Sequence, residues 1–125
     1  MKQISTTNAP AAIGPYSQAL RVGNMVFVSG QIPVDPATGL MANTIEAQAK
    51  QSLTNLKNIL AAEGLTMQNV IKTTVFLADL ADFVKVNEVY ATFFTQPYPA
   101  RSCVQVAAIP QGAGVEIECI AVVED

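Results

Sequence analysis

The last strand-like stretch of the sequence reads Val115-Glu116-Ile117-Glu118-Cys119-Ile120-Ala121-Val122-Val123. Successive side chains of a β-strand point to opposite faces of its sheet. The apolar residues of this stretch therefore divide between the two faces, with Ile117, Cys119 and Ala121 opposing Ile120 and Val122. An earlier run, Met25 to Gly30, is also apolar on both faces. These two segments predict a sheet that is buried on both sides.

Helical spacing of apolar residues appears twice between these strands. The first predicted helix begins near Ile45, where Asn43 and Glu46 suit a capping box, and Gly64 suits its C-terminal end. The second follows Asp79 or Asp82, either of which could cap it. Its apolar stripe consists of Phe83, Val86, Tyr90 and Phe93. Further strands are predicted at 70–77 and 101–108, besides 115–123.

This order of elements predicts an α+β sandwich in which both helices lie on one face of a sheet. Two helices cannot cover both apolar faces. We infer that other copies of the chain bury the second face, with loops of the same chain as the alternative cover. The chain of 125 residues, half of them hydrophobic, has the size and composition of a single domain spanning residues 1–125.

Composition excludes several classes of chemistry. The sequence contains no histidine, which removes Ser-His-Asp and Cys-His catalysis and the commonest metal ligand. Its two cysteines, Cys103 and Cys119, form no CxxC pair, so a zinc site would have to rely on carboxylates. No glycine-rich phosphate loop is present either. We expect no metal and no nucleotide cofactor.

Charge and hydropathy indicate the kind of partner and the cellular location. The net charge is −3, and the seven basic residues are scattered singly along the chain, which argues against nucleic acid as the main partner. No apolar stretch has the length of a membrane span, and no leader-like segment is seen. The sequence therefore predicts a cytoplasmic protein with reduced thiols and no membrane contact.

The remaining groups that could carry chemistry are an arginine, a thiol and two carboxylates. By strand period, Arg101 and Cys103 share one sheet face, and Glu116 and Glu118 share one. A guanidinium can hold a carboxylate ligand bidentately, but an ion pair between Arg101 and Glu116 or Glu118 is the alternative. Cys103 has no His or Lys beside it in the sequence, so we do not assign it a nucleophilic role.

Several motifs together resemble the reactive intermediate deaminase family, also called Rid or YjgF. The resemblance is carried by Pro99-Ala100-Arg101-Ser102-Cys103-Val104, Val115-Glu116-Ile117-Glu118, Ala12-Ile13-Gly14-Pro15-Tyr16-Ser17-Gln18, Ser29-Gly30-Gln31-Ile32-Pro33, Lys72-Thr73-Thr74-Val75-Phe76 and the segment 82–90. These motifs cover nearly the whole chain in order, and they are most similar to the imine-deaminating branch that keeps both the Arg and the Glu.

The resemblance implies a chorismate-mutase-like (ferredoxin-like) sandwich, a homotrimer whose sheets form a central barrel, and active sites between subunits. It implies two catalytic residues. Arg101 would bind the substrate carboxylate, and Glu116 would position a water. The implied substrate-binding residues are Tyr16, Ser29, Gly30, Asn87 and Cys103. Ala108 and the turn Gln111-Gly112-Ala113-Gly114 differ from the commoner family pattern, which bears on substrate preference and the rim of the site.

The implied activity is hydrolysis of short 2-imino acids, such as 2-iminobutanoate and 2-iminopropanoate, to 2-keto acids and ammonia, without metal or organic cofactor. Such a reaction would protect metabolism from reactive enamine and imine intermediates. A protonated imine is already a strong electrophile, which is consistent with a site that lacks histidine. The alternative within the family is an RNA-directed activity, ribonuclease or translation-inhibiting, or a ligand-binding regulatory role.

Overall fold

The computed structural model describes residues 1–124, so Asp125, at the end of the predicted domain, lies outside the described residues. The chain forms one mixed six-stranded sheet and two helices, which confirms the predicted α+β class. The elements are β1 Lys2–Ile4, β2 Ala19–Val22, β3 Met25–Gln31, α1 Ile45–Ala61, β4 Val70–Leu77, α2 Phe83–Ala91, β5 Ala100–Gln105 and β6 Val115–Val122, with short 3-10 turns η1 Met67–Asn69, η2 Leu80–Asp82 and η3 Pro110–Gly112.

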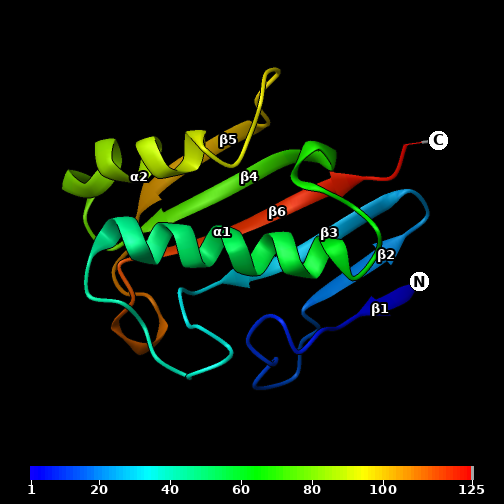
Figure 1. Cartoon of the computed structure of the whole chain (residues 1–125), viewed down its shortest axis with the longest axis horizontal. Helices are drawn as coiled ribbons and strands as arrows, with labels where there is room; N and C mark the ends of the chain where they lie inside the picture. The colour runs from blue at the N-terminus through cyan, green and yellow to red at the C-terminus, as the bar shows by residue number, and fades with distance from the viewer. Residues whose placement is uncertain (125) are drawn as a thin grey trace.

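The sheet has the strand order β1-β2-β3-β6-β4-β5, with β6 among the inner strands (Figure 1). Every neighbouring pair is antiparallel except β4 and β5, which run parallel. The crossover between β4 and β5 contains α2. This arrangement leaves β5, which carries Arg101, at one edge of the sheet.

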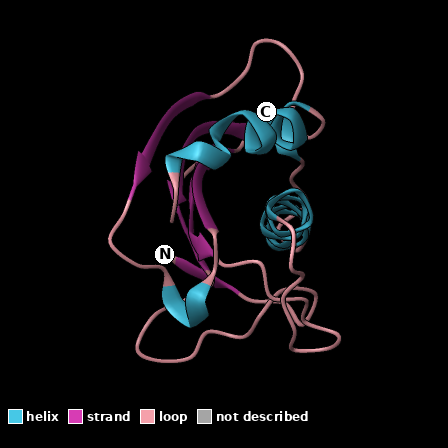
Figure 2. Ribbon diagram, turned by 90° about the vertical axis from the view of Figure 1, so that its left-hand side faces the viewer, coloured by secondary structure: helices cyan, strands magenta, loops and turns pink. Residues whose placement is uncertain are grey.

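Both helices lie on the same side of the sheet, as predicted (Figure 2). Alternate residues of β6, from Val115 to Ala121, are buried on that side. They pack with an apolar stripe of α1 that includes Leu53, Leu56 and Ile59, all fully buried. Burial of these large aliphatic side chains supplies most of the driving force for folding.

The opposite side of the sheet, which we call the open face, is apolar and uncovered. Phe27 of β3 is 45% exposed, Val104 of β5 is 43% exposed and Val22 of β2 is 49% exposed. The strand register places all three on this face, together with Ile120 of β6. Loops of the same chain therefore do not bury the second face, which was the alternative drawn from the sequence.

The helix α1 begins at Ile45 as predicted, but its N-cap lies one residue later than predicted. Thr44, not Asn43, is the N-cap, and its Oγ1 accepts a hydrogen bond of 3.2 Å from the Ala47 N–H. Thr44 has the extended backbone of a cap residue and directly precedes the first helical residue, Ile45. At the other end of α1 the C-cap is Ala62 rather than the predicted Gly64, which lies two residues further on and adopts the left-handed conformation, with φ +74°.

The second helix also begins differently from the prediction. Asp79 caps the short turn η2 by accepting a hydrogen bond from the Ala81 N–H, and α2 continues directly from that turn. Asp82 makes no side-chain capping bond. Of the predicted stripe, Val86 and Tyr90 are buried, whereas Phe83 is 37% exposed. This partial exposure leaves the Phe83 ring near the surface, beside the candidate site.

Candidate functional site

Arg101 and Glu116, the two predicted catalytic residues, lie on opposite faces of the sheet. Thr73 of β4 pairs with Arg101 of β5 and with Cys119 of β6. Directly paired residues share a sheet face, so these three side chains point to the helix side. Phe76 of β4 pairs with Glu116 in the same register, which places Glu116 on the open face. The sheet itself therefore separates the two groups within one chain.

The position of these groups on opposite faces excludes, within one chain, the alternative ion pair between Arg101 and Glu116 or Glu118. Ion pairs among residues 1–124 join Glu63 to Lys2 and to Arg21, and none involves Arg101. The prediction that Arg101 and Cys103 share one face, and Glu116 and Glu118 share one, is consistent with the register. Residue types alone could not show that the two pairs lie on opposite faces.

The guanidinium of Arg101 is held by neutral groups. Its Nη1 donates a hydrogen bond of 2.7 Å to Oδ1 of Asn87 in α2. Its Cζ lies 4.8 Å from the centre of the Tyr90 ring and 5.5 Å from that of Phe83. Tyr90 in turn shares a hydrogen bond of 2.7 Å with Oγ1 of Thr73. The positive charge of Arg101 thus has no anionic partner in the described part of the chain.

Cys103 follows two residues along β5 and is half-buried. Burial raises the pKa of its thiol, and the nearby Arg101 charge offsets only part of that effect. Cys119 is buried more deeply, and burial followed by the Glu118 charge raises its pKa to about 12. With raised pKa values, neither sulfur is activated as a thiolate, which is consistent with the prediction that Cys103 is not a nucleophile.

Glu116 lies in a cleft of about 1020 Å³ beside β3. The predicted residues Tyr16, Ser29 and Gly30 line the same cleft, and so does Glu118. The register of β3 against β6 shifts between Val28 and Gln31, which forms a bulge at Ser29 and Gly30. Bulges of this kind redirect side chains and are frequent beside active sites. The structure thus brings four of the seven predicted site residues together.

The absence of a side chain at Gly30 leaves the space that the Glu116 carboxyl group occupies. A Cβ atom built on Gly30 would lie 2.9 Å from both Cδ and Oε2 of Glu116, closer than ordinary contact. Burial raises the pKa of Glu116, and the like charge of Glu118 raises it further. A carboxyl group with a raised pKa is suited to accept and return a proton near neutral pH.

The loop before β2 forms another wall of the cleft. Ser29 Oγ donates to the Ser17 carbonyl at 2.6 Å, and the Tyr16 hydroxyl accepts from the Ile13 N–H at 3.3 Å. The buried amide of Gln18 donates to the Pro10 carbonyl at 2.7 Å. It also holds the loop at the Thr6 backbone, as donor and acceptor. Sequence reasoning gave no role to Gln18, although it lies within a quoted motif.

The predicted site therefore divides into two half-sites. The cleft half-site contains Tyr16, Ser29, Gly30 and Glu116, on or beside the open face. The arginine half-site contains Arg101 and Asn87, joined by a hydrogen bond. Cys103 lies on the same sheet face as Arg101. Sequence reasoning did not identify Tyr90, Phe83 and Thr73 as neighbours of Arg101, since their spacing indicated only core positions.

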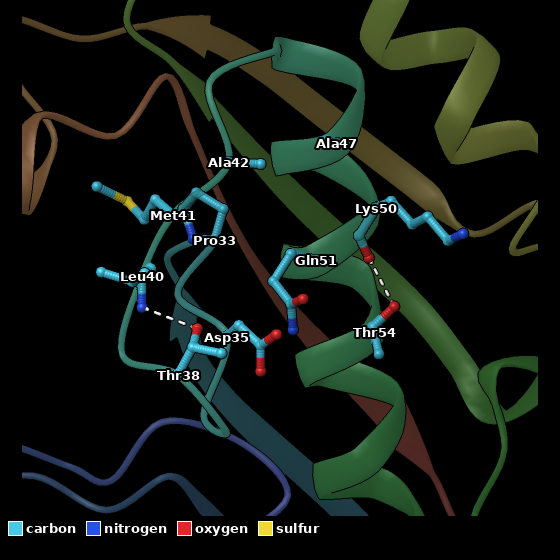
Figure 3. A pocket seen from close by; sticks show the side chains of 10 residues that line it. All are labelled: Pro33, Asp35, Thr38, Leu40, Met41, Ala42, Ala47, Lys50, Gln51 and Thr54. Atoms are coloured by element: carbon cyan, nitrogen blue, oxygen red, sulfur yellow. Dashed lines mark hydrogen bonds between the residues drawn. The ribbon is translucent and has the colours of Figure 1, made fainter.

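A second cavity, of about 550 Å³, lies between the loop 33–42 and α1 (Figure 3). Its walls include Asp35, Leu40, Lys50 and Gln51, and none of the predicted site residues. Within residues 1–124, the Cys, Asp and Glu side chains form no group of three that could hold a metal ion. No helix in the same range is long and apolar enough to cross a bilayer.

The fold of this chain is the same as that of several proteins of known structure. The chain superposes on RidA from an Antarctic Psychrobacter with a TM-score of 0.95 and 47% identity, over 98% of this chain and 100% of that chain. It superposes on Escherichia coli TdcF with bound serine with a TM-score of 0.95 and 51% identity, over 99% of this chain and all of the other. These are α+β proteins of the same architecture.

The family follows from the sequence comparison. The family model described as Endoribonuclease L-PSP matches residues 6–123. The chain therefore belongs to this family, the YjgF or Rid family, and the resemblance seen in the motifs is confirmed.

Two similar relatives carry the name 2-iminobutanoate/2-iminopropanoate deaminase. The Salmonella typhimurium protein is 56% identical over 124 residues, covering 97% of each chain. The mouse protein is 55% identical over 122 residues, covering 97% of this chain and 90% of its own.

Proposed function

We propose that this protein is an enzyme that hydrolyses 2-iminobutanoate, 2-iminopropanoate and similar short 2-imino acids to 2-keto acids and ammonia. The observation that carries the proposal is the Arg101 guanidinium, which is fixed in place and has no anionic partner among the described residues. Such a group is prepared to bind a substrate carboxylate in two-point fashion. The names of relatives that are more than half identical support the same substrates.

In the proposed mechanism, Arg101 binds the substrate carboxylate and Glu116 orients a water over the imine carbon. As the water oxygen bonds to that carbon, one water proton passes to Glu116 and the C=N electron pair moves to nitrogen. Glu116 then returns its proton to nitrogen, the C–N bond breaks, and the hydroxyl proton passes to the departing ammonia, which leaves as ammonium while the carbonyl forms. Backbone groups near Gly30 and Cys103 are assigned to the imine nitrogen. Positioning and proton transfer suffice for this chemistry.

The proposal includes a homotrimer with a central barrel and active sites between subunits. Two observations support it. The open face exposes Phe27, Val22 and Val104, which is the kind of surface that association buries. In addition, Arg101 and Glu116 lie on opposite sides of their own sheet, so a small substrate could contact both only if they came from different chains. The unpaired thiols of Cys103 and Cys119 support a cytoplasmic location within the same proposal.

The name of the family, Endoribonuclease L-PSP, raises the alternative of RNA as substrate. The charge pattern favours the imine instead. The net charge is −3, the basic residues are isolated from one another, and the cleft that contains Glu116 also contains Glu118. Two carboxylates in a cleft would repel a phosphate backbone. They are compatible with a protonated imine nitrogen.

The test is a coupled assay in which a threonine dehydratase supplies 2-iminobutanoate and the formation of 2-oxobutanoate is followed. We expect the wild-type protein to accelerate this step, and Arg101→Lys to lose nearly all of the acceleration, because Lys offers a point charge without the planar fork. Arg21→Lys is the matched control, since Arg21 pairs with Glu63 at the other end of the sheet. An Arg101→Lys variant with near wild-type acceleration would contradict the assignment.

A further inference from the structure

The surroundings of Arg101 pose a question that the proposed mechanism leaves open, namely what orients its guanidinium. Arg101 lies on the edge strand β5, where the neighbouring residues Ala100 and Ser102 are exposed. A long side chain on such a strand has many rotamers available, and two-point binding of a carboxylate requires one of them. Within the described residues, no carboxylate pairs with Arg101 to select that rotamer.

The groups that do hold Arg101 are an amide and two aromatic rings. Asn87 accepts one hydrogen bond from Arg101 and so satisfies one of the five guanidinium N–H groups. The Tyr90 ring lies closer to the guanidinium carbon than the Phe83 ring does, at 4.8 Å against 5.5 Å. A cation over an aromatic face is attracted by the ring quadrupole without being neutralised. The charge of Arg101 thus stays free for a substrate.

Tyr90 is itself packed and hydrogen-bonded within the core. Its side chain is buried, it packs against Phe94 with ring centres 4.6 Å apart, and its hydroxyl shares a 2.7 Å hydrogen bond with Thr73. Thr73 is also the residue directly paired with Arg101 between β4 and β5. One fully buried threonine therefore fixes both the backbone position of Arg101 and the position of the ring beneath it.

We propose that Tyr90 is a positioning residue, whose ring face, anchored by Thr73, holds Arg101 in the orientation that binds the substrate carboxylate. The inference takes its ligand, a substrate carboxylate, from the proposed function, whereas the contact between Tyr90 and Arg101 does not depend on that function. Tyr90 contacts Arg101 rather than substrate, so its removal should leave a charged arginine that binds carboxylates in many orientations. The expected loss in carboxylate affinity is about tenfold, within the range of a partly buried cation–π contact.

The composition of the chain makes a direct spectroscopic test possible. Arg21 and Arg101 are the only arginines in the sequence, so protein labelled with ¹⁵N-arginine has two side-chain Nε–Hε signals. Arg101→Lys assigns them. We expect the Arg101 signal to be displaced by the ring current of Tyr90 and to show contacts to the Tyr90 ring protons in the wild-type protein. Arg21, which donates to Gly23 and pairs with Glu63, provides an internal reference.

Three variants then separate positioning from stability. Tyr90→Leu should move the Arg101 signal, leave that of Arg21 in place and weaken binding of 2-oxobutanoate, the stable product, about tenfold. Tyr90→Phe keeps the ring face but loses the hydrogen bond to Thr73, so its Arg101 signal and its affinity should lie between those of the wild type and those of Tyr90→Leu. Val86→Ala is the matched control, because Val86 is buried in the same helix but is not among the groups that hold the guanidinium.

The outcomes are distinct. Wild-type protein without contacts between Arg101 and the Tyr90 ring would overturn the proposal, even if Tyr90→Leu does not fold. So would a Tyr90→Leu variant with the wild-type signal and affinity, or equal losses in Val86→Ala. Wild-type protein that neither binds 2-oxobutanoate nor hydrolyses the imine would contradict the proposed function, while the Arg101 signal would still decide whether Tyr90 positions the arginine.

Discussion

Arg101 and Glu116 carry opposite charges, and the fold surrounds each with a different environment. Aromatic rings and an amide hold Arg101, which leaves its charge uncompensated within the described chain. Glu116 is half-buried over Gly30 with Glu118 beside it in the same cleft, and both effects raise its pKa. The first arrangement suits the binding of an anion, and the second suits the transfer of a proton.

The Glu118 charge gives a prediction about pH. As the proposed base, Glu116 would act only when deprotonated, so hydrolysis should decline as the pH falls through its pKa. Glu118 raises that pKa. Glu118→Gln removes the like charge, lowers the pKa of Glu116 and should therefore move the acid limb of the pH–rate profile to lower pH, with the plateau rate retained. The profile is measured from keto-acid formation at equal imine supply.

The control for this prediction is Glu46→Gln, which removes an exposed carboxylate in the first turn of α1, outside the cleft. Its acid limb should coincide with that of the wild type. An acid limb that stays in place in Glu118→Gln, or moves to higher pH, would show that Glu116 is not the titrating base.

Among the elements, β3 determines the position of the Glu116 carboxyl group, because Gly30 in its bulge lies directly against that group. Gly30→Ala should fold, because the backbone of Gly30 is not left-handed and the added Cβ meets only the flexible end of the Glu116 side chain. The carboxyl group must move, however, and a displacement of this kind can reduce hydrolysis by about a hundredfold. Keto-acid formation and urea unfolding, measured on the same sample, test both statements.

Gly23→Ala is the opposite case and serves as the control. Gly23 has a left-handed backbone, with φ +63°, in the turn between β2 and β3, and open space surrounds the position of a Cβ. Alanine there should cost about 1 kcal/mol of unfolding free energy and leave hydrolysis unchanged. Loss of activity in proportion to stability in both variants would contradict the role assigned to Gly30.

The cap of α1 supplies a prediction for stability alone. Thr44→Ala removes the side-chain acceptor for the Ala47 N–H and should lower the unfolding free energy by about 1 kcal/mol. Asn43→Ala should have almost no effect, although the sequence pattern made Asn43 the expected cap. Urea denaturation at one fixed protein concentration compares the two variants. Equal losses, or a larger loss in Asn43→Ala, would reject the assignment of the cap.

Much of the fold could be predicted from sequence periodicity. The strand Val70–Leu77 has the predicted bounds, and both helices occur where apolar spacing placed them. β1 and β2 were missed, because three or four residues carry too little periodicity to be recognised. β5 ends at Gln105 rather than Ala108, where the Gln105 side chain accepts from the Leu80 N–H. Contacts between distant segments decide such ends.

The sequence allowed residues to be proposed for the candidate site, but not the geometry in which they are arranged. Arg101 and Glu116 could be singled out by residue type and by the family motifs. Their positions on opposite faces depend on the register of β4 against its two neighbours, which no local pattern contains. The same holds for Tyr90, whose helical spacing indicates the core and whose ring also lies against Arg101.

For the whole molecule, the sheet has one face covered by helices and one apolar face that its own chain leaves open (Figure 2). Each chain carries an arginine half-site on the first side and a cleft half-site towards the second. The homotrimer proposed above would explain both features at once, because association buries the open face and lets half-sites of different chains meet.

Complementation between two variants that are each expected to be inactive tests this central claim most directly. Arg101→Ala and Glu116→Gln are unfolded together in equal amounts, refolded, and assayed for hydrolysis of 2-iminobutanoate, with each variant refolded alone as a control. If each site takes its arginine from one chain and its glutamate from another, random assembly restores about a quarter of the wild-type activity. A mixture that is no more active than the separate variants would contradict sites shared between chains.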